Sequence, residues 1–407
     1  MKVAPAGVSR FRIEGRAARE GLLLRLCDED GRESWGEAAP ISGWSTETLE
    51  EAERALLAVC ARAAKGDVGA GRGELGIDEG RAPVDAVGAA LAPFAESLRG
   101  SPSARFALET AMLDLLARRR GEDVAASLCA GAAGPADSGV GAGGRTGGSA
   151  DSGPAAWIET GTLLSGAGEG EAFVARGLAA LARGFRVLKV KLSAEDDGAL
   201  VREIEGLSAL RRAAPDFELR LDPNGRWSVE DARRRLAMLA PLGPAFVEQP
   251  VPREALSALG KCAVPWAADE SLASAVLPEG LSREHGCSAF VLKPAALGIL
   301  RARELAALAA SRGLAVVVTH FLDGPVGLSA ACETALSLAR GPAMMPVAAC
   351  GLDPHSGVTA LPRGWLPHHA VPGCVQRTSM RGLGLPAELD AALCERRAPK
   401  LPLSTTR

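Results

Sequence analysis

The chain of 407 residues is short of several residue types that would support particular chemistries. It contains no tyrosine, so a tyrosine hydroxyl cannot act as a catalytic acid. Its nine cysteines include no C-x-x-C pair, and an odd number at irregular spacing indicates reduced cysteines in a reducing compartment. Only seven of its 46 basic residues are lysine, which makes the position of each lysine informative.

The chain also lacks the sequence features of exported, membrane-bound and nucleic-acid-binding proteins. Its N-terminus has no continuous apolar segment of the kind that signal peptides carry. No apolar run approaches the roughly 20 residues that a membrane span needs. The net charge of −3 and the isoelectric point near 6.1 argue against nucleic acid or an anionic membrane as a partner. We therefore expect a soluble cytoplasmic protein.

Length and composition predict two domains with a linker between them. With 47% apolar residues, the chain can form a small domain and a full barrel of about 250 residues. Strand-like runs precede amphipathic helices in the first part, and Gly, Ala and Ser then dominate a segment that we interpret as a flexible linker. We divide the chain into an α+β capping domain, the linker, a (β/α) barrel and a Pro-rich C-terminal segment, over 1–129, 130–155, 156–355 and 356–407.

Five short apolar runs in the middle of the chain each end in charged residues. Four or five apolar residues in a row fit a strand that is buried on both faces, as in a parallel sheet. The charged residues at the ends are Lys189, Lys191, Asp222, Glu248, Asp269 and Lys293. From Lys191 onward they recur at intervals of 31, 26, 21 and 24 residues, which suit one strand, one helix and two loops. Because the strands of a closed parallel barrel all end at one rim, these side chains should meet there.

Three carboxylates flanked by lysines predict a site for a divalent cation and for proton transfer. Asp and Glu oxygens are the ligands that hard cations such as Mg²⁺ prefer. Lysine can lose its proton when it lies near other cations, whereas arginine cannot. Lys189 and Lys191 share one face of a strand because they lie two residues apart. Two ammonium groups this close disfavour each other's charge, so at least one of them can accept a proton near neutral pH.

In their order along the chain, these motifs resemble those of the enolase superfamily, in its muconate-lactonizing-type branch. The pattern is Lys-x-Lys at 189–191, Asp-x-Asn at 222–224, Glu-Gln-Pro at 248–250, Asp-Glu-Ser at 269–271 and Lys-Pro at 293–294. Within that branch, GEAAPISGWSTETLEEA (36–52) and ACGLD (349–353) are most similar to the o-succinylbenzoate synthases. The resemblance implies a modified, TIM-like (β/α) barrel with an α+β capping domain that is built from the N-terminal and C-terminal segments.

The resemblance implies that three strand-end carboxylates bind one metal ion. Asp222, Glu248 and Asp269 would hold Mg²⁺, or Mn²⁺ in its place. Asn224 follows Asp222 by two residues and would contact a ligand or the lysine pair from the same side. Glu270 would point to the opposite side of its strand, provided that the strand stays regular.

The lysines would carry out the proton chemistry of the implied reaction. Lys191 would remove the proton α to the substrate carboxylate and then protonate the departing hydroxyl, while Lys189 would tune Lys191 electrostatically. Lys293, on the other side of the metal, would stay protonated and stabilise the enediolate. The implied reaction is the dehydration of the small carboxylate 2-succinyl-6-hydroxy-2,4-cyclohexadiene-1-carboxylate to o-succinylbenzoate, a step of menaquinone biosynthesis.

Five further residues are candidates for substrate contacts: Trp44, Ser45, Thr46, His320 and Gly351. The first three match the cap loop that covers the substrate in the family, and the last lies where the barrel backbone can approach it. Many relatives carry a Ser-Ser and Glu-Ser-Gly type segment where this chain has THFLDGPVG. Thr319, His320 and Asp323 depart from that pattern, which leaves the contacts to the substrate carboxylate or succinyl group open.

Two other kinds of function stay open. N-succinylamino acid racemases and dipeptide epimerases on the same scaffold use the same metal and lysines, so the barrel motifs do not separate them from the dehydratase. A dipeptide epimerase would carry an Asp-x-Asp segment near the eighth strand, which 348–353 lacks. From a different class, the chain could be a non-catalytic barrel that only binds a ligand, although the complete set of acids and lysines argues against this.

Overall fold

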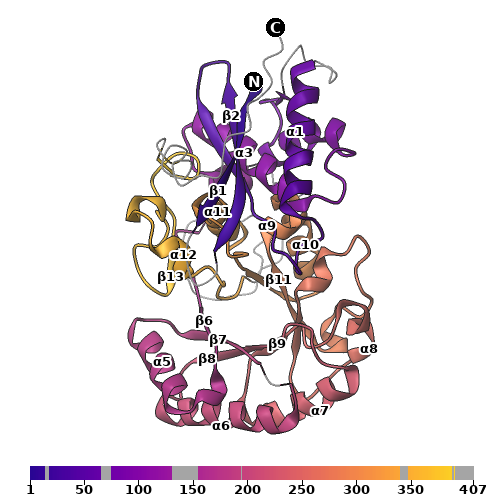
Figure 1. Cartoon of the computed structure of the whole chain (residues 1–407), viewed down its shortest axis with the longest axis vertical. Helices are drawn as coiled ribbons and strands as arrows, with labels where there is room; N and C mark the ends of the chain where they lie inside the picture. Colours follow the sequence, from indigo (N-terminus) through magenta and orange to yellow (C-terminus); the bar gives the residue numbers. More distant parts are fainter. Residues whose placement is uncertain are drawn as a thin grey trace, which may run out of the picture.

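Two lobes make up the molecule, one with the N-terminal sheet and one with a barrel of parallel strands (Figure 1). The structure is a computed structural model, and it describes residues 1–13, 18–65, 75–130, 155–193, 195–339, 347–386 and 389. The predicted linker over 130–155 lies almost entirely outside the described residues. None of the helices in this described part is long and apolar enough to cross a membrane.

The N-terminal lobe, or cap, is a four-stranded antiparallel sheet with helices packed on it. The strands lie in the order β3-β2-β1-β4, with the bounds β1 Lys2–Ile13, β2 Arg19–Asp28, β3 Glu33–Ala38 and β4 Leu75–Gly76. The helices are α1 Leu49–Lys65, α2 Pro83–Leu91, α3 Pro102–Arg120 and α4 Val124–Cys129. Strand β3 packs closely on α3, since a Cβ atom at Gly36 would lie 1.8 Å from the carbonyl oxygen of Ala107. Only glycine fits at that position.

The second lobe is a sheet of seven parallel strands in sequential order, β6 to β12, with helices outside it. The strands are β6 Thr162–Leu164, β7 Val187–Lys191, β8 Glu218–Asp222, β9 Phe246–Glu248, β10 Trp266–Ala268, β11 Cys287–Leu292 and β12 Ala315–Val318. The helices are α5 Glu171–Ala182, α6 Asp197–Ala213, α7 Val229–Leu239, α8 Leu256–Leu259, α9 Pro294–Leu297, α10 Ile299–Ser311 and α11 Pro325–Ala339. The strands are short and mostly buried, as expected for a parallel sheet that helices cover.

A stretch over 347–351 closes the curled sheet in place of a regular eighth strand. On one side, the backbone N–H groups of Ala348 and Gly351 donate to carbonyls of β12 at 2.9 Å. On the other side, Cys350 and the stretch 159–161 exchange two hydrogen bonds of 2.8 Å. The segment 157–164, at the start of the predicted barrel, contains two separate strands. Its first part, β5 Trp157–Glu159, pairs with β13 Cys374–Gln376, and only β6 joins the parallel sheet.

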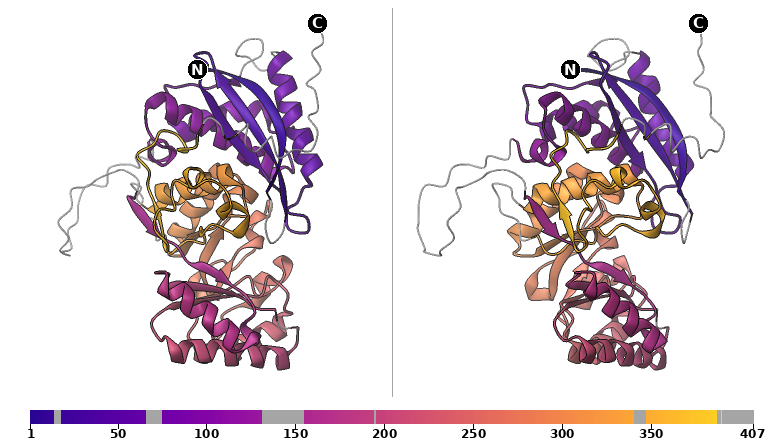
Figure 2. Two further views of the ribbon diagram at one scale, coloured as in Figure 1. Left: turned by 60° about the vertical axis from the view of Figure 1, so that its left-hand side comes forward. Right: turned by 90° about the vertical axis from the view of Figure 1, so that its left-hand side faces the viewer.

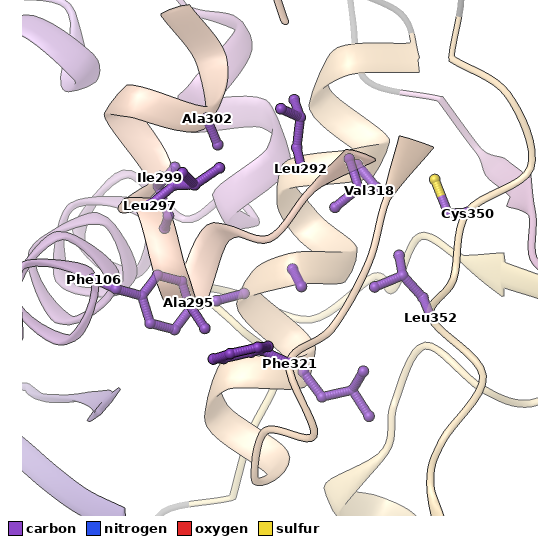
Figure 3. Packing of buried hydrophobic residues seen from close by; sticks show 14 of the residues in the cluster. Phe106, Leu292, Ala295, Leu297, Ile299, Ala302, Val318, Phe321, Cys350 and Leu352 are labelled. Carbon is purple, nitrogen blue, oxygen red and sulfur yellow. The ribbon is translucent and has the colours of Figure 1, made fainter. Parts of the chain in front are cut away.

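The apolar core has two parts. Five residues that point into the barrel form a small cluster of their own, namely Phe246, Ala267, Ala289, Val291 and Val317. A much larger cluster lies outside the strands and continues into the cap. Figure 3 shows the place where Phe106 of α3 meets Ala295 and Leu297 of the barrel lobe. This continuous packing holds the cap over the C-terminal ends of the barrel strands.

Residues after the barrel run back along both lobes (Figure 2). They include α12 Ser356–Thr359 and β13. Near the end of the described part, Leu383 N donates to Asp114 Oδ1 at 2.8 Å and Gly382 N donates to the carbonyl of Glu122 at 2.9 Å. These bonds attach the C-terminal segment to α3 and to the turn that follows it.

Candidate active site

A cavity of about 260 Å³ lies at the C-terminal ends of the barrel strands, beneath the cap. Its walls combine barrel residues with Ile41 and Trp44, which belong to the cap loop after β3. Several charged side chains line it, including Lys189, Lys191, Arg220, Glu248 and Lys293. The structure thus brings together strand ends that are far apart in the sequence.

Three acids at neighbouring strand ends are almost completely buried. Asp222, Glu248 and Asp269 have exposed fractions of 1%, 2% and 4%. Lys189 Nζ lies 2.8 Å from Asp222 Oδ2 and 2.5 Å from Glu248 Oε1. Glu248 and Asp269 also share a hydrogen bond between their carboxyl groups. One ammonium group and one hydrogen bond therefore link all three acids.

Lys191 and Lys293 lie at the two ends of this row of acids. Lys191 Nζ is 3.0 Å from Asp222 Oδ2 and donates a hydrogen bond of 2.5 Å to Asn224 Oδ1. Asn224 has φ 56, a left-handed conformation that asparagine tolerates better than most residues, and its Nδ2 is buried with no hydrogen-bond partner among the described residues. At the other end, Lys293 Nζ forms an ion pair with Asp269 Oδ2.

Burial and charge act against each other on these groups. Burial alone would raise the pKa of Asp222, but the neighbouring lysines hold it below its usual range. Burial raises the pKa of Glu248 to about 8, with Lys189 opposing the shift and Asp222 adding to it. Burial would lower the pKa of Lys189, but Asp222 and Glu248 raise it. We expected the closeness of Lys189 and Lys191 to favour the loss of a proton from one of them. At Lys189, the two carboxylates in direct contact have the larger effect and favour the charged form.

Glu270 lies beside the acids, because the strand does not stay regular as far as this residue, which the prediction for Glu270 required. Strand β10 ends at Ala268, and the alternation of a strand therefore does not extend to Asp269 and Glu270. Both residues line a second cavity of about 30 Å³, together with Lys293 and Trp44. Both carboxyl oxygens of Glu270 are buried and have no hydrogen-bond partner among the described residues.

The chemistry of the cluster fits a divalent cation. Four carboxyl groups lie near three ammonium groups, and one of the four, that of Glu270, has no hydrogen-bond partner within the described residues. Carboxylate oxygens are the donors that Mg²⁺ and Mn²⁺ prefer. In the part of the chain that the structure describes, no three His, Cys, Asp or Glu side chains are arranged to hold a metal ion. The ammonium groups of Lys189 and Lys293 contact the acids, so a bound ion would share these carboxyl groups with the two lysines.

Of the three cap-loop candidates, only Trp44 lines the cavity. Its ring centroid lies 5.3 Å from Lys191 Nζ and 5.7 Å from Lys293 Nζ, within the range of cation–π attraction. The hydroxyl groups of Ser45 and Thr46 form hydrogen bonds of 2.9 and 3.1 Å inside the loop. These two residues shape the loop and do not line the cavity.

His320 and Gly351 both line the cavity. His320 Nδ1 accepts a hydrogen bond of 3.0 Å from Leu322 N, so Nε2 carries the proton and donates to the carbonyl of Asp353 at 3.0 Å. Burial, with a neighbouring histidine, lowers the pKa of His320 to about 3, so the ring is neutral and both nitrogens are occupied. A Cβ atom at Gly351 would lie 2.8 Å from Thr319 Cγ2, so a larger residue does not fit there.

Three polar residues of the cavity were not predicted from the sequence, namely Thr162, Arg220 and Asp353. Arg220 precedes Asp222 by two residues on β8, so strand alternation could have identified it as pointing into the barrel. It donates to the carbonyl of Ala349 at 2.6 Å, across the barrel. Thr162 donates to Asp353 Oδ2 at 2.7 Å, and no local pattern marks this pair because 191 residues separate the two.

A capped parallel barrel with a row of buried acids between lysines defines the class of protein. The chain belongs to the enolase superfamily, since the family described as Enolase C-terminal domain-like matches residues 172–384, about half of the chain. In addition, the family described as MenC, N-terminal domain, matches residues 7–73.

The curated relatives include two activities. An o-succinylbenzoate synthase of Mycobacterium leprae is 37% identical over 158 residues, which are 38% of this chain and 46% of that protein. A D-Ala-D/L-Ala epimerase of Cytophaga hutchinsonii is 35% identical over 159 residues, which are 38% of this chain and 42% of that protein. These two matches span less than half of each relative. A hydrophobic dipeptide epimerase of Citrifermentans bemidjiense is 29% identical over 336 residues, 79% of each chain.

The fold of this chain is similar to the folds of solved structures along almost its whole length. A dipeptide epimerase of Cytophaga hutchinsonii, complexed with Mg and the dipeptide D-Ala-L-Val, has a TM-score of 0.73 to this chain. The alignment covers 97% of this chain and 98% of the other, at 21% identity. At this identity the likeness shows the fold alone.

Proposed function

We propose that the chain is a metal-dependent dehydratase of the o-succinylbenzoate synthase type. The observation that carries the proposal is the row of buried acids with a lysine at each end, in a cavity that the cap covers. The match of residues 7–73 to the MenC N-terminal domain and the relative from Mycobacterium leprae support the choice of substrate. The reaction would convert 2-succinyl-6-hydroxy-2,4-cyclohexadiene-1-carboxylate to o-succinylbenzoate and water.

The row of acids would supply the electrostatic part of the reaction. Asp222, Glu248 and Asp269 would hold Mg²⁺ or Mn²⁺, and Glu270 lies next to them. A proton next to a carboxylate is very weakly acidic, and a bound divalent cation supplies positive charge where negative charge develops on the carboxylate oxygens. Asn224 Nδ2 is buried with no hydrogen-bond partner within the described part of the chain, and it would donate to the substrate or to the hydroxyl oxygen that leaves it.

Lys191 would be the base. It contacts one carboxylate and the uncharged Asn224 Oδ1, whereas Lys189 contacts two carboxylates and is held in its charged form. The neutral amine of Lys191 takes the ring proton α to the carboxylate, and the electron pair moves toward that carboxylate. The electron pair then returns from the carboxylate to the ring, and the C–O bond breaks as the ammonium group of Lys191 protonates the hydroxyl. Water leaves and the ring becomes aromatic, which makes the second half favourable.

Lys293 would contribute charge. Its ammonium group is paired with Asp269 and lies 5.7 Å from the ring centroids of both Trp44 and Phe321. An acid and two aromatic rings all favour a positively charged neighbour. Burial would lower the pKa of Lys293, but Asp269 and the other acids raise it. A lysine held in this way stabilises an enediolate and is a poor second base, which favours dehydration over racemisation.

One observation favours a second candidate, a dipeptide epimerase. Asp353 lines the cavity, and Thr162 holds its Oδ2 at 2.7 Å. A carboxylate in this position would attract the ammonium group of a dipeptide and repel the succinyl carboxylate of the dehydratase substrate. The hydrophobic dipeptide epimerase of Citrifermentans bemidjiense, which matches 79% of the chain, is consistent with this candidate.

Purified protein with Mg²⁺, tested on both substrate classes, separates the two candidates. Loss of the diene absorbance in the ultraviolet measures dehydration, and NMR in D₂O measures exchange of the α-proton in dipeptides and N-succinyl amino acids. We expect dehydration that falls at least about 10²-fold in Lys191→Ala. Exchange on dipeptides alone, with its loss in Asp353→Asn, would replace the dehydratase by the epimerase. A folded protein that binds Mg²⁺ and turns over neither class would contradict both.

A further inference from the structure

A loop over 319–324 forms one wall of the cavity and carries a strained backbone. It joins β12 to α11, and its first four residues line the cavity. Leu322 has φ 54, a left-handed conformation that is unfavourable for a leucine, and its side chain is 36% exposed. Packing of the side chain therefore does not explain this conformation, and other contacts must hold it.

Two hydrogen bonds inside the loop fix its shape. Asp323 Oδ2 accepts from Phe321 N at 2.9 Å, and His320 Nδ1 accepts from Leu322 N at 3.0 Å. The loop bears on both ends of the cavity, because the Phe321 ring lies beside Lys293 and the second ring nitrogen of His320 bonds to the stretch that carries Asp353. A shift of this loop would therefore change the surroundings of both Lys293 and Asp353.

The cap holds the loop from outside. Glu37 of β3 is 1% exposed, and it accepts hydrogen bonds from Gly324 N at 2.5 Å and from Gly327 N at 2.9 Å, at the start of α11. Arg19 of β2 donates to the carbonyl of Leu322 at 3.3 Å and to a cap carbonyl at 2.6 Å. Two side chains of the cap thus bind the loop, Arg19 at the strained Leu322 and Glu37 at Gly324, where the loop ends.

The loop sequence leaves room for the Glu37 side chain. A Cβ atom at Gly324 would lie 2.7 Å from Glu37 Oε2, and one at Gly327 would lie 3.2 Å from Glu37 Oε1. The first N–H groups of a helix have no partner within the helix, and negative charge or an acceptor is favourable there. Glu37 supplies these acceptors to α11 from another lobe of the molecule, and α11 is buried along almost its whole length.

We propose that Glu37 is a positioning residue for the reaction. By fixing the start of α11, it holds the loop over 319–324 in its strained form and keeps Phe321 beside Lys293. Arg19 supports the same arrangement from the more exposed side. The effect on KM rests on the proposed function, because it requires the substrate to bind in the cavity that this loop lines. The effect on the loop does not rest on it.

Glu37→Gln tests the proposal, since glutamine replaces one of the two acceptor oxygens by a donor that faces a backbone N–H. Glu333→Gln is the matched control. Glu333 is fully buried in the same helix, α11, and accepts from Ala125 N at 2.5 Å, at the start of another helix, but its partners lie away from the loop. In Glu37→Gln, hydrogen–deuterium exchange at Gly324 and Gly327 should accelerate at least about tenfold, with no change there in the control. The KM should rise about tenfold while kcat falls less than about threefold, because the cavity wall moves and the base does not.

Unchanged exchange at Gly324 and Gly327 in Glu37→Gln would overturn the proposal, and so would equal changes in KM for both variants. The exchange measurement uses no substrate, so it decides the role of Glu37 even if neither candidate substrate is turned over. Should Glu37→Gln fail to fold, Arg19→Met removes the other contact and keeps most of the apolar stem. It should accelerate exchange at Phe321 and Leu322 and raise KM in the same direction, and wild-type values of both would refute the inference.

Discussion

Lys189→Met removes the ammonium group that links two buried acids and keeps a side chain of similar length. Lys189 Nζ lies 2.8 Å from Asp222 Oδ2 and 2.5 Å from Glu248 Oε1, and neither acid is more than 2% exposed. Removing one partner of a buried ion pair costs about 3–5 kcal/mol, because the other charge stays buried without compensation. Asp222 keeps Lys191 at 3.0 Å, and burial raises the pKa of Glu248 to about 8, so Glu248 need not carry a charge at neutral pH. We therefore expect the lower end, a loss of about 3 kcal/mol in the free energy of unfolding.

Magnesium should return the variant to about the stability of the metal-free wild type. An ion present at 100 times its dissociation constant stabilises the folded state by about 2.7 kcal/mol. With one positive charge fewer beside the acids, the variant should also bind Mg²⁺ more tightly than the wild type. Urea denaturation with and without Mg²⁺ measures the first effect, and isothermal titration calorimetry measures the second. Lys261→Met, a change at an exposed lysine, is the control and should stay within about 0.5 kcal/mol of the wild type.

Two outcomes would refute this reasoning. A variant as stable as the wild type without Mg²⁺ would mean that Lys189 does not compensate the buried acids. Weaker binding of Mg²⁺ by the variant would mean that Asp222 and Glu248 do not hold the ion.

Three further changes test the site and its surroundings. Lys191→Ala should lower the rate of dehydration at least about 10²-fold, because general acid–base catalysis contributes about 10²–10⁴-fold. Lys293→Arg keeps the positive charge and should retain part of the dehydration activity. The opposite pattern would reverse the roles of the two lysines. Excess chelator should abolish turnover and Mg²⁺ or Mn²⁺ should restore it, so full activity in chelator would exclude the metal. Burial, together with the nearby Asp323, raises the pKa of Glu37 from 4.5 to about 8. Between pH 4.5 and about 8, folded Glu37 therefore holds a proton that the unfolded chain has lost, and the free energy of unfolding of the wild type falls as the pH rises through this range. Urea titrations across that pH range should show a smaller loss of unfolding free energy in Glu37→Gln than in the wild type. An equal dependence on pH in both proteins would contradict the raised pKa of Glu37.

The architecture of the barrel could be predicted because one local unit repeats. Each apolar run forms a short buried strand, and the helices between the runs return the chain to the same end of the sheet. The register of β7 and β8 places Lys189 beside Arg220 and Lys191 beside Asp222. Strand alternation and this register place the lysine pair and the first acid on one face. The enolase superfamily follows from the same order of motifs and is shown by the family match.

Local rules failed where the chain leaves regular structure. Glu270 faces the acids because β10 ends before it, and the place where a strand ends depends on its neighbours in the sheet. The segment at 157–164 divides between two sheets for the same reason, since β5 finds its partner in β13, more than 200 residues later in the chain. Trp44, Ser45 and Thr46 are adjacent in the sequence, yet only Trp44 lines the cavity.

By itself, the sequence determined which groups stand at the strand ends, because period and alternation act over a few residues. Only the tertiary structure decided which other residues join them. Thr162 meets Asp353 across 191 residues, and Glu37 meets Gly324 across 287. Such contacts depend on how the cap seats on the barrel and how the barrel closes. Packing of whole elements sets both, and no pattern within a single element records the identity of its distant partner.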